Sequence, residues 1–412
     1  MSDSLFDALA ERGLVAQCTD PEGIRRRLAT PLTVYGGFDP TADSLHVGHL
    51  VPILTLARFQ RAGHQPFLLV GGATGMIGDP SGKSDVRKML SRDDILANTK
   101  ALKGQLGRLV RFGDGPGDAR LVDNADWFAA MGWIDVMRDL APHFSVNRML
   151  SMESVKGRLD AGISYLEFSY MVMQAYDFVH LFRHHGCTLQ IGGQEQWGNI
   201  VMGIELGRRI ANADLAGLTL PLVTKADGTK FGKTESGAVW LDPQRTPIHE
   251  FYQFWRNVAD ADVRRYLCYF TFLDLAEIGR LTADGGNAIN QAKEVLAWEL
   301  TNLVHGQAEA DAARDSARRA FGAAQDVSGE TIPHATLLST EIESGIALIA
   351  LIVRAELATS NGEARRLITG GGVRLGDTVI DDPARTVGPL DIHDRRIVLK
   401  VGKRKIFRFD VG

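Results

Sequence analysis

The sequence predicts a doubly wound α/β domain, followed by a small helical domain and a small α+β domain. Two short apolar segments, TVYGGF at 33–38 and PFLLVG at 66–71, have the length of buried strands. A helical stretch from about His49 to Ala62 separates them, with Pro52 in its first turn, where a missing N–H costs little. Two strands joined by a helix form a βαβ unit, and such a unit implies a parallel sheet.

The same alternation continues as far as residue 224. Apolar runs at 188–191 and 218–223 can supply further strands, and helical patterns separate them. We therefore expect residues 1–240 to form a Rossmann-like domain with a doubly wound parallel sheet.

Two further domains are expected after it. Strand signals fade from about Pro247, which predicts a small helical domain at 241–325. A linker rich in Ser, Thr and Gly is expected at 326–343. Residues 344–412 show helices, a GG turn and short strands, which predict a separate α+β domain.

Composition restricts the class of protein. The 412 residues are 45% hydrophobic and 23% charged, an ordinary balance for a globular protein that argues against long disorder. Three cysteines, Cys18, Cys187 and Cys268, stand far apart, which fits a reduced compartment and not a disulfide framework. No stretch approaches the ~20 apolar residues of a membrane helix. We therefore expect a cytoplasmic protein without membrane contact and without a signal peptide.

Positive charge gathers at the C-terminal end, although the net charge of the chain is only −4. The last 22 residues contain seven basic and three acidic side chains. Such a patch can contact a polyanion, but a solvated surface explains it equally well. The basic residues are Arg395, Arg396, Lys400, Lys403, Arg404, Lys405 and Arg408.

A histidine pair stands where the first strand turns into a helix. His46 and His49 flank Gly48 in the sequence FDPTADSLHVGHL. A helix N-terminus favours phosphate, and glycine lets a base or ribose approach the backbone. Most HxxH pairs are structural, so a phosphate-binding pair and a structural pair both remain open at this point.

A glycine-rich loop follows the second strand, in the sequence GGATGMIGDPSGKS at 71–84. It matches neither a P-loop nor a GxGxxG fingerprint, because Ile77 and Ala73 stand at required glycine positions. It is either a flexible turn or a substrate loop. In the second case Asp79 is an ammonium partner, and Lys83 and Arg87 supply positive charge for a polyphosphate.

A helix opened by Ser164 carries a polar stripe. Ser164 and Glu167 form a capping box, and Tyr170, Gln174 and Asp177 then share one face. The surrounding residues are apolar, so three polar groups on this face need partners. Either a buried structural network or a pocket for a small polar ligand satisfies them.

Two other polar segments have weaker patterns. QIGGQEQWGN ends a strand with amides and an acid, Gln196 and Glu195 among them, which suit ribose hydroxyls or an amino group. The loop KFGKT at 230–234 can close Lys230 and Lys233 over a triphosphate, although such loops are common on surfaces. His180, His184 and His185 have no acid or cysteine at ligand spacing, so we expect no metal site there.

Taken in this order, the segments resemble the bacterial tyrosyl-tRNA synthetases over nearly the whole chain. HVGH at 46–49 is similar to the HIGH signature of class I synthetases, and KFGKT to their KMSKS signature. The stretch 358–368 resembles an RNA-binding module first recognised in a ribosomal small-subunit protein. The resemblance implies activation of tyrosine with ATP, transfer to tRNA(Tyr) and a homodimer, with Mg²⁺ accompanying ATP and no dedicated protein site.

The resemblance also implies residue roles. Tyr35 and Asp177 would bind the tyrosine phenol. Tyr170, Gln174 and Asp79 would hold its ammonium group, and Gln196 would also line this pocket. The positions implied for ATP are Gly37, Asp39, Thr41, His46, Gly48, His49, Gly193 and Glu195. Those implied for its phosphates are Lys83, Arg87, Lys230, Lys233 and Thr234. Two departures, Gly36 in place of a common cysteine and Glu195 in place of aspartate, concern ribose contacts.

Three alternatives remain at this stage. A tryptophanyl-type synthetase shares the implied fold, but Tyr35 and Asp177 favour a phenol over an indole. An RNA-binding protein on a retired synthetase scaffold would have no reason to keep His46, His49 and the two lysines together. A nucleotide-binding oxidoreductase is disfavoured because the GxGxxG fingerprint is missing.

Overall fold

The computed structural model describes most of the chain as two compact units. These are Met1–Arg314 and Asp315–Gly412, and each is described by itself. The described residues are 4–79, 90–159, 162–226, 228, 231–234, 237–283, 287–322, 333–376, 378–392, 395–402 and 405–412.

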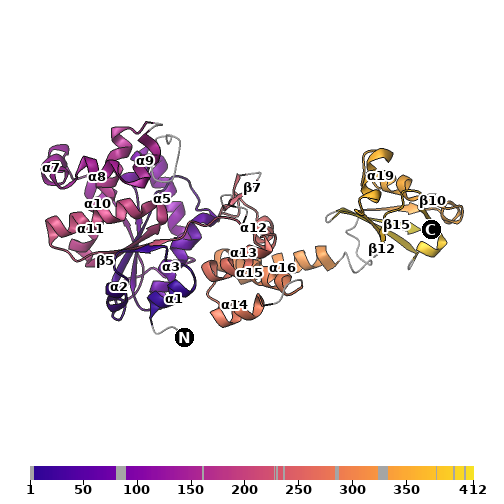
Figure 1. The fold of residues 1–412 in the computed structure, drawn as a ribbon, viewed down its shortest axis with the longest axis horizontal. Coiled ribbons are helices and arrows are strands. Elements are labelled where there is room, and N and C mark those ends of the chain that lie inside the picture. Colours follow the sequence, from indigo (N-terminus) through magenta and orange to yellow (C-terminus); the bar gives the residue numbers. More distant parts are fainter. Residues whose placement is uncertain are drawn as a thin grey trace. The chain divides into compact units, whose positions relative to one another are not determined.

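The first unit is built on a six-stranded, mostly parallel sheet in the order β1-β6-β5-β2-β3-β4. Figure 1 shows this sheet, with β5 labelled, among the helices of the unit. Only β1 runs antiparallel to its neighbour, β6. The predicted α/β class and the predicted strands are confirmed, while β1 and β4 were not predicted. The strands are β1 Gln17–Cys18, β2 Thr33–Phe38, β3 Gln65–Val70, β4 Arg120–Asp123, β5 Cys187–Gly193 and β6 Ala216–Leu220.

Strand β2 lies at the switch point of this sheet. The chain moves from β2 to β3 and β4 on one side, and to β5 and β6 on the other. Ligands of such sheets bind at the carboxyl ends of the strands beside the switch point. Here the carboxyl ends of β2, β3 and β5 lead into the segments that the sequence singled out.

Helices surround the sheet. They are α1 Leu5–Glu11, α2 Pro21–Arg27, α3 Leu50–Arg61, α4 Thr74–Ile77, α5 Arg92–Leu106, α6 Ala125–Phe128, α7 Trp133–Asp139, α8 Val146–Leu150, α9 Glu153–Leu159, α10 Tyr165–His185 and α11 Trp197–Ala211. Short 3₁₀ turns are η1 Val47–His49, η2 Ala141–His143 and η3 Gln194–Gln196.

The long helix α10 begins and ends where local chemistry predicts. Its capping box is formed, with Glu167 N–H donating to Ser164 Oγ at 3.2 Å and Ser164 N–H to Glu167 Oε2 at 3.0 Å. It ends at Gly186, whose φ of 63° lies in the left-handed region that suits glycine. The cap fixes the position of the polar stripe on this helix.

The rest of the first unit is helical after a small hairpin of β7 Lys233–Thr234 and β8 Gly237–Ala238. Helix α13 is joined to the sheet domain by Arg12 and by Arg58 of α3. Both guanidinium groups donate to the carbonyl oxygens of Cys268 and Thr271 at the end of this helix, where cations are favoured. The helices are α12 Ile248–Arg256, α13 Asp260–Phe270, α14 Leu275–Leu281, α15 Asn287–His305 and α16 Gln307–Gly322, which runs into the second unit.

In its described residues the second unit contains a five-stranded sheet in the order β12-β11-β14-β15-β9. Besides the end of α16, it has three helices around an apolar core. Strand β9 and helix α17 lie in the segment that was predicted to be linker, and β9 pairs in parallel with β15. The ordered unit thus starts earlier than the sequence suggested. Its elements are β9 His334–Leu337, α17 Ser339–Glu343, β10 Ile346–Ala347, α18 Leu348–Arg354, α19 Asn361–Thr369, β11 Val373–Leu375, β12 Thr378–Ile380, β13 Thr386–Val387, η4 Pro389–Asp391, β14 Arg396–Val401 and β15 Lys405–Val411.

The basic end of the chain forms β14 and β15. Arg408 is buried and pairs with Asp410 at 3.0 Å, so it does not belong to an exposed basic patch as expected. Lys403 and Arg404 lie outside the described residues. Among the described residues, no helix has the length and hydropathy to cross a membrane.

Candidate active site

A chain of hydrogen bonds crosses the carboxyl edge of the sheet. Tyr170 Oη on α10 donates to Asp39 Oδ2 at 3.0 Å, and Thr74 Oγ1 donates to Asp39 Oδ1 at 2.9 Å. Asn124 Nδ2 in turn donates to Thr74 Oγ1 at 3.0 Å. Gly71 makes room for this arrangement, because a Cβ there would collide with Asp39 Oδ1 and Thr74 Oγ1.

Asp177 is buried at the inner end of this chain. Trp127 Nε1 donates to Asp177 Oδ1 at 2.9 Å and Asn124 Nδ2 to Oδ2 at 3.1 Å. Burial raises the pKa of Asp177 well above its usual range, although both hydrogen bonds lower it. Tyr35 is 1% exposed, and its hydroxyl has no hydrogen-bond partner among the described residues. Burial is the main cause that raises the pKa of Tyr35, and the charge of Asp177 is the second. Tyr35 and Asp177 therefore lie close enough to interact within one buried region.

A second polar group lies between α10, the glycine loop and η3. Gln196 Nε2 donates to Asp79 Oδ2 at 2.6 Å. Asn199 Nδ2 donates to Gln174 Oε1 at 2.9 Å and to Gln196 Oε1 at 3.1 Å. The structure therefore brings together the acid and both amides that the sequence singled out, although they come from three separate segments.

Four residues of these networks were not identified from the sequence: Thr74, Asn124, Trp127 and Asn199. For Asn124 and Trp127 the sequence does contain a signal, the segment LVDNADWF at 121–128, in which polar residues follow a short apolar pair. That is the pattern of a strand ending at the carboxyl edge, and the structure shows it as β4. Recognising β4 would have placed Asn124 and Trp127 at the site.

The histidine pair caps the turn that leads into α3. Gly48 N–H donates to His46 Nδ1 at 3.1 Å, and His46 N–H donates to His49 Nδ1 at 3.2 Å. In a neutral His46 ring the proton therefore resides on Nε2, which makes that atom a donor. Gly48 is required here, because a Cβ would lie 2.8 Å from His46 Cε1.

The histidine segment and the KFGKT segment pack against each other. Val47 N–H donates to the Val239 carbonyl at 3.0 Å, and Leu241 N–H to the Leu45 carbonyl at 2.8 Å. Val239 N–H also donates to the carbonyl of Gly232 at 3.0 Å. Gly232 has a φ of 79°, and a Cβ there would come 2.9 Å from Val47 Cγ2. Two motifs far apart in sequence are thus joined by these backbone hydrogen bonds, and we refer to the joined segments as the backbone frame.

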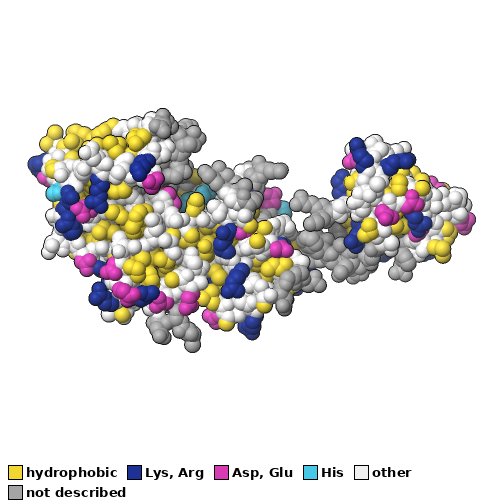
Figure 2. Space-filling view, viewed as in Figure 1, with side chains coloured by type: hydrophobic (Ala, Val, Ile, Leu, Met, Phe, Trp, Pro, Cys, Tyr) yellow, Lys and Arg dark blue, Asp and Glu magenta, His cyan; other side chains and the backbone are white. Residues whose placement is uncertain are grey.

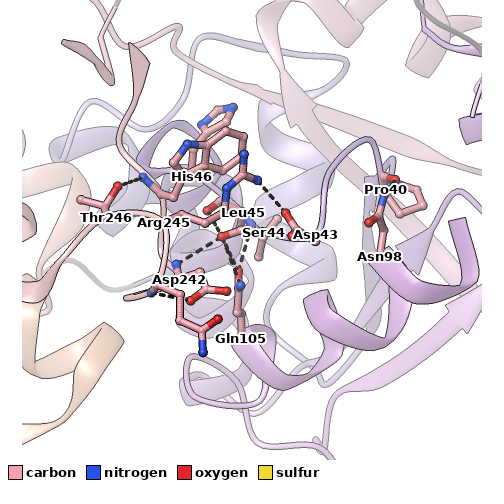
Figure 3. Close-up of polar contacts among 12 residues, drawn as sticks. Pro40, Asp43, Ser44, Leu45, His46, Asn98, Gln105, Asp242, Arg245 and Thr246 are labelled. Carbon is pink, nitrogen blue, oxygen red and sulfur yellow. Dashed lines mark hydrogen bonds and ion pairs between the residues drawn. The ribbon is translucent and has the colours of Figure 1, made fainter. Parts of the chain in front are cut away.

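Side chains around Ser44 strengthen this frame (Figure 3). Gln105 of α5 accepts from Leu45 N–H at 2.9 Å and donates to Ser44 Oγ at 3.1 Å. Ser44 Oγ also accepts from Asp242 N–H at 3.2 Å. Helix α5 is thereby joined to the loop that precedes the histidines and to the segment that follows the KFGKT hairpin.

Arg245 contacts residues on both segments of this backbone frame. Arg245 pairs with Asp43 at 2.6 Å (Figure 3). The Cζ atom of Arg245 lies 3.6 Å from the ring centroid of Trp240. The Trp240 ring meets the His46 ring edge-on at 6.0 Å. These contacts limit the orientations that the His46 ring can adopt.

The KFGKT segment is also attached to the helical part of the unit. The Phe231 ring packs in an aromatic cluster, with centroid distances of 5.0–5.5 Å to Tyr266, Phe270, Trp255 and Phe254. Ala226 N–H donates to the buried Asp262 carboxylate at 2.9 Å. Lys233 and Thr234 form β7. Lys83, Arg87 and Lys230 lie outside the described residues.

The remaining predicted positions lie beside the same edge. Gly193 ends β5, and a Cβ there would collide with the Glu195 carboxylate. Glu195 helps to line a cavity of about 460 Å³ together with Gln17, Met152 and Trp197. Gly37 lies in β2 and Thr41 is exposed in the turn after it. At Gly36 a Cβ would come 3.3 Å from Leu56 Cδ1, so a cysteine would fit only with a small shift.

The three histidines of α10 follow Asp177 along the helix. The His180 ring stacks on Trp127, with a centroid distance of 4.2 Å and an interplanar angle of 17°. Burial, and then the neighbouring His184, His185 and Arg183, lower the pKa of His180 to about 4. Among the described residues, no group of three or more His, Cys, Asp or Glu side chains is placed to hold a metal ion.

Comparison with known proteins gives two family matches. Residues 27–322 match the family described as tRNA synthetases class I (W and Y), and residues 348–392 match the S4 domain. Tyrosine--tRNA ligase of Rhizobium meliloti (strain 1021) is 47% identical, covering 96% of each chain. The same enzyme of Roseiflexus castenholzii is 48% identical, covering 97% of this chain and 98% of the relative.

Solved structures agree with these matches. A C-terminally truncated mitochondrial tyrosyl-tRNA synthetase of Aspergillus nidulans has a TM-score of 0.69 at 32% identity, covering 77% of this chain and 94% of its own. Tyrosyl-tRNA synthetase of Archaeoglobus fulgidus, at 17% identity, shares the fold with a TM-score of 0.56. The chain belongs to the class I tRNA synthetases (W and Y) and, within them, to the tyrosine--tRNA ligases.

Proposed function

We propose that this chain activates L-tyrosine with ATP to tyrosyl-adenylate and then transfers the tyrosyl group to the 3′-terminal ribose of tRNA(Tyr). The observation that carries the proposal is the buried pair of Tyr35 and Asp177 at the carboxyl edge of the sheet. A tyrosine phenol can supply the partner of the buried Tyr35 hydroxyl. The family membership and the adjoining histidine segment agree with this assignment.

Discrimination against phenylalanine follows from the same pair. Phenylalanine would fill the pocket but would leave the buried hydroxyl of Tyr35 and the carboxyl of Asp177 without the phenol. An unsatisfied buried polar group costs about 1–3 kcal/mol, and more when it is charged. We assign the ammonium group of tyrosine to Asp79, Tyr170 and Gln174, with Gln196 holding Asp79 in place.

The first step needs positioning more than acid–base chemistry. The tyrosine carboxylate is already a nucleophile and attacks the α-phosphate of ATP in line, releasing pyrophosphate. Catalysis then rests on alignment and on donors aimed at the charge that develops on the phosphoryl group. We assign that role to His46 Nε2 and to Thr41.

The other ATP contacts are assigned by position. Gly37, Asp39, Gly48, His49, Gly193 and Glu195 would surround the nucleoside and its phosphates. Lys83, Arg87, Lys230, Lys233 and Thr234 would hold the leaving pyrophosphate, with contacts that strengthen in the transition state. Magnesium is the counter-ion of the ATP triphosphate, and we assign it no protein ligand.

The direct test is amino-acid-dependent exchange of labelled pyrophosphate into ATP without tRNA. We expect exchange with tyrosine and far slower exchange with phenylalanine or tryptophan, because only tyrosine satisfies Tyr35 and Asp177. Equal exchange with tryptophan would contradict the phenol assignment. No exchange from folded protein would overturn adenylate formation.

We further propose that two copies associate through an apolar face formed by α7, α8 and the start of α10. Ile134 is 72% exposed and Tyr165 64%, and hydrophobic side chains gather over this part of the first unit (Figure 2). Contiguous exposed apolar surface of this kind marks an association site. The face comprises Trp133, Ile134, Met137, Val146, Tyr165 and Leu166.

Changing Ile134 to aspartate is expected to convert a dimer into a monomer, because the new charge would be buried in the interface. Sedimentation velocity measures the change directly. Leu96, 55% exposed on α5, is the matched control, and Leu96→Asp should leave the dimer intact. A monomeric parent protein, or a dimeric Ile134→Asp variant, would contradict the proposed interface.

A further inference from the structure

We propose that His180 is a positioning residue for amino-acid specificity. Its ring holds Trp127 in the orientation that hydrogen-bonds Asp177. The inference rests on the proposed function of Asp177 as the group that reads the phenol. It adds a residue that lies outside the tyrosine pocket and has no assigned role in the reaction.

The geometry of α10 brings the three side chains together. Asp177 and His180 are three residues apart and therefore lie on the same side of the helix. Trp127 contacts both of them. Its indole Nε1 donates to Asp177 Oδ1 at 2.9 Å, and its ring lies nearly parallel to the His180 ring at 4.2 Å. The stack thus fixes the plane in which the indole N–H points at the carboxylate.

Trp127 depends on such a contact because its own helix is short. Helix α6 has four residues, and none of them is buried. A single turn is not stable by itself and needs tertiary contacts. Its first residues are held by Asp123, which accepts from Ala125 N–H at 2.9 Å, and by the preceding Asn124, which accepts from Ala73 N–H at 2.8 Å. Trp127, at the other end, is held by Asp177, by His180 and by packing against the apolar cluster that includes Phe178.

The neutral state of His180 suits this role. The pKa of about 4 leaves the ring uncharged near neutral pH, so it stacks as a flat aromatic group. His184 continues the stack outward, with its ring 4.3 Å from His180, and is exposed. His184 is therefore a close comparison: it has the same residue type, lies one turn further along the helix and has no ring contact with Trp127.

Loss of the stack should act on the amino acid more than on ATP. A rotated indole removes one of the two donors that hold the Asp177 carboxyl, and the phenol-reading geometry loosens. Aromatic stacking contributes little beyond buried area, so the expected effect is a loss of about three- to tenfold in discrimination. The ATP contacts assigned to the histidine segment come from other elements, so we expect the KM for ATP to stay unchanged.

The experiment compares His180→Ala, His180→Leu, His180→Phe and His184→Ala in pyrophosphate exchange. The readout is kcat/KM for tyrosine divided by kcat/KM for phenylalanine, with KM for ATP alongside. This ratio does not depend on the fraction of active enzyme, so partial unfolding alone leaves it unchanged. We expect alanine and leucine at position 180 to lower the ratio, while His180→Phe and His184→Ala retain it within about twofold.

Two results would overturn the inference. One is a parental ratio in His180→Ala and His180→Leu, and the other is a loss in His180→Phe as large as in His180→Ala. Asp177→Asn, measured in parallel, separates this failure from failure of the proposed function. If Asp177→Asn keeps the parental ratio, the phenol assignment itself is wrong. If it abolishes discrimination while the His180 variants do not, only the positioning role fails.

Discussion

Replacing Asp177 with alanine is expected to lower kcat/KM for tyrosine by about 100-fold or more, with little change in KM for ATP. The hydrogen bond between the phenol and Asp177 would be lost, and leaving a buried polar group unsatisfied costs about 1–3 kcal/mol. The variant also strands the donors of Trp127 and Asn124, which are now paired with the two carboxyl oxygens. Steady-state pyrophosphate exchange at varied tyrosine measures the loss.

Asp126 provides the matched control for this change. It lies in α6 beside Trp127 and is exposed, and Asp126→Ala removes a nearby carboxylate without touching the buried pair. We expect Asp126→Ala to keep the parental kinetics. Near-normal tyrosine kinetics in Asp177→Ala would rule out its role, and an equal loss in both variants would point to a general effect of charge.

The polar stripe of α10 shows how far a pattern in sequence can reach. Its capping box and the spacing of Tyr170, Gln174 and Asp177 predicted one polar face on an apolar helix, and the structure places all three in hydrogen-bond networks. The spacing of residues on a helix face follows from the helix alone, so the sequence of this one segment was enough to predict the polar face. The same reasoning predicted β2, β3 and α3, whose apolar runs and turn residues are local signals.

Partners from other segments were not predictable in this way. Asn124 and Trp127 follow β4, a strand of four residues that are only partly buried and give no continuous apolar run. The pairing of residues 45–47 with 239–241 joins segments almost 200 residues apart, and no local preference encodes it. β9 lies in the segment that was predicted to be linker. Its four residues gain their stability by pairing with β15, at the other end of the unit, and no local pattern shows that pairing.

Replacing His46 with alanine is expected to lower the rate of tyrosine activation by about 100- to 1000-fold while the Kd for tyrosine is kept. That is the usual cost of removing one donor aimed at charge that develops in a transition state. The proposed tyrosine pocket is built from α10, β2, the segment after β4 and the glycine loop, and none of the hydrogen bonds described there involves His46. Single-turnover activation and equilibrium tyrosine binding separate the two quantities.

His46→Asn tests whether the imidazole acts on phosphate or only caps the turn. Asparagine is a good N-cap, so it can still accept from Gly48 N–H, but its amide is shorter than the imidazole and cannot place a donor where Nε2 lies. We expect His46→Asn to remain slow, and His249→Ala, an exposed histidine, to behave as the parent. Recovery of the parental rate in His46→Asn would assign His46 to the structure of the turn. A large loss of tyrosine affinity in His46→Ala would contradict the assignment to the phosphoryl group, because it would mean that the histidine segment also shapes the amino-acid pocket.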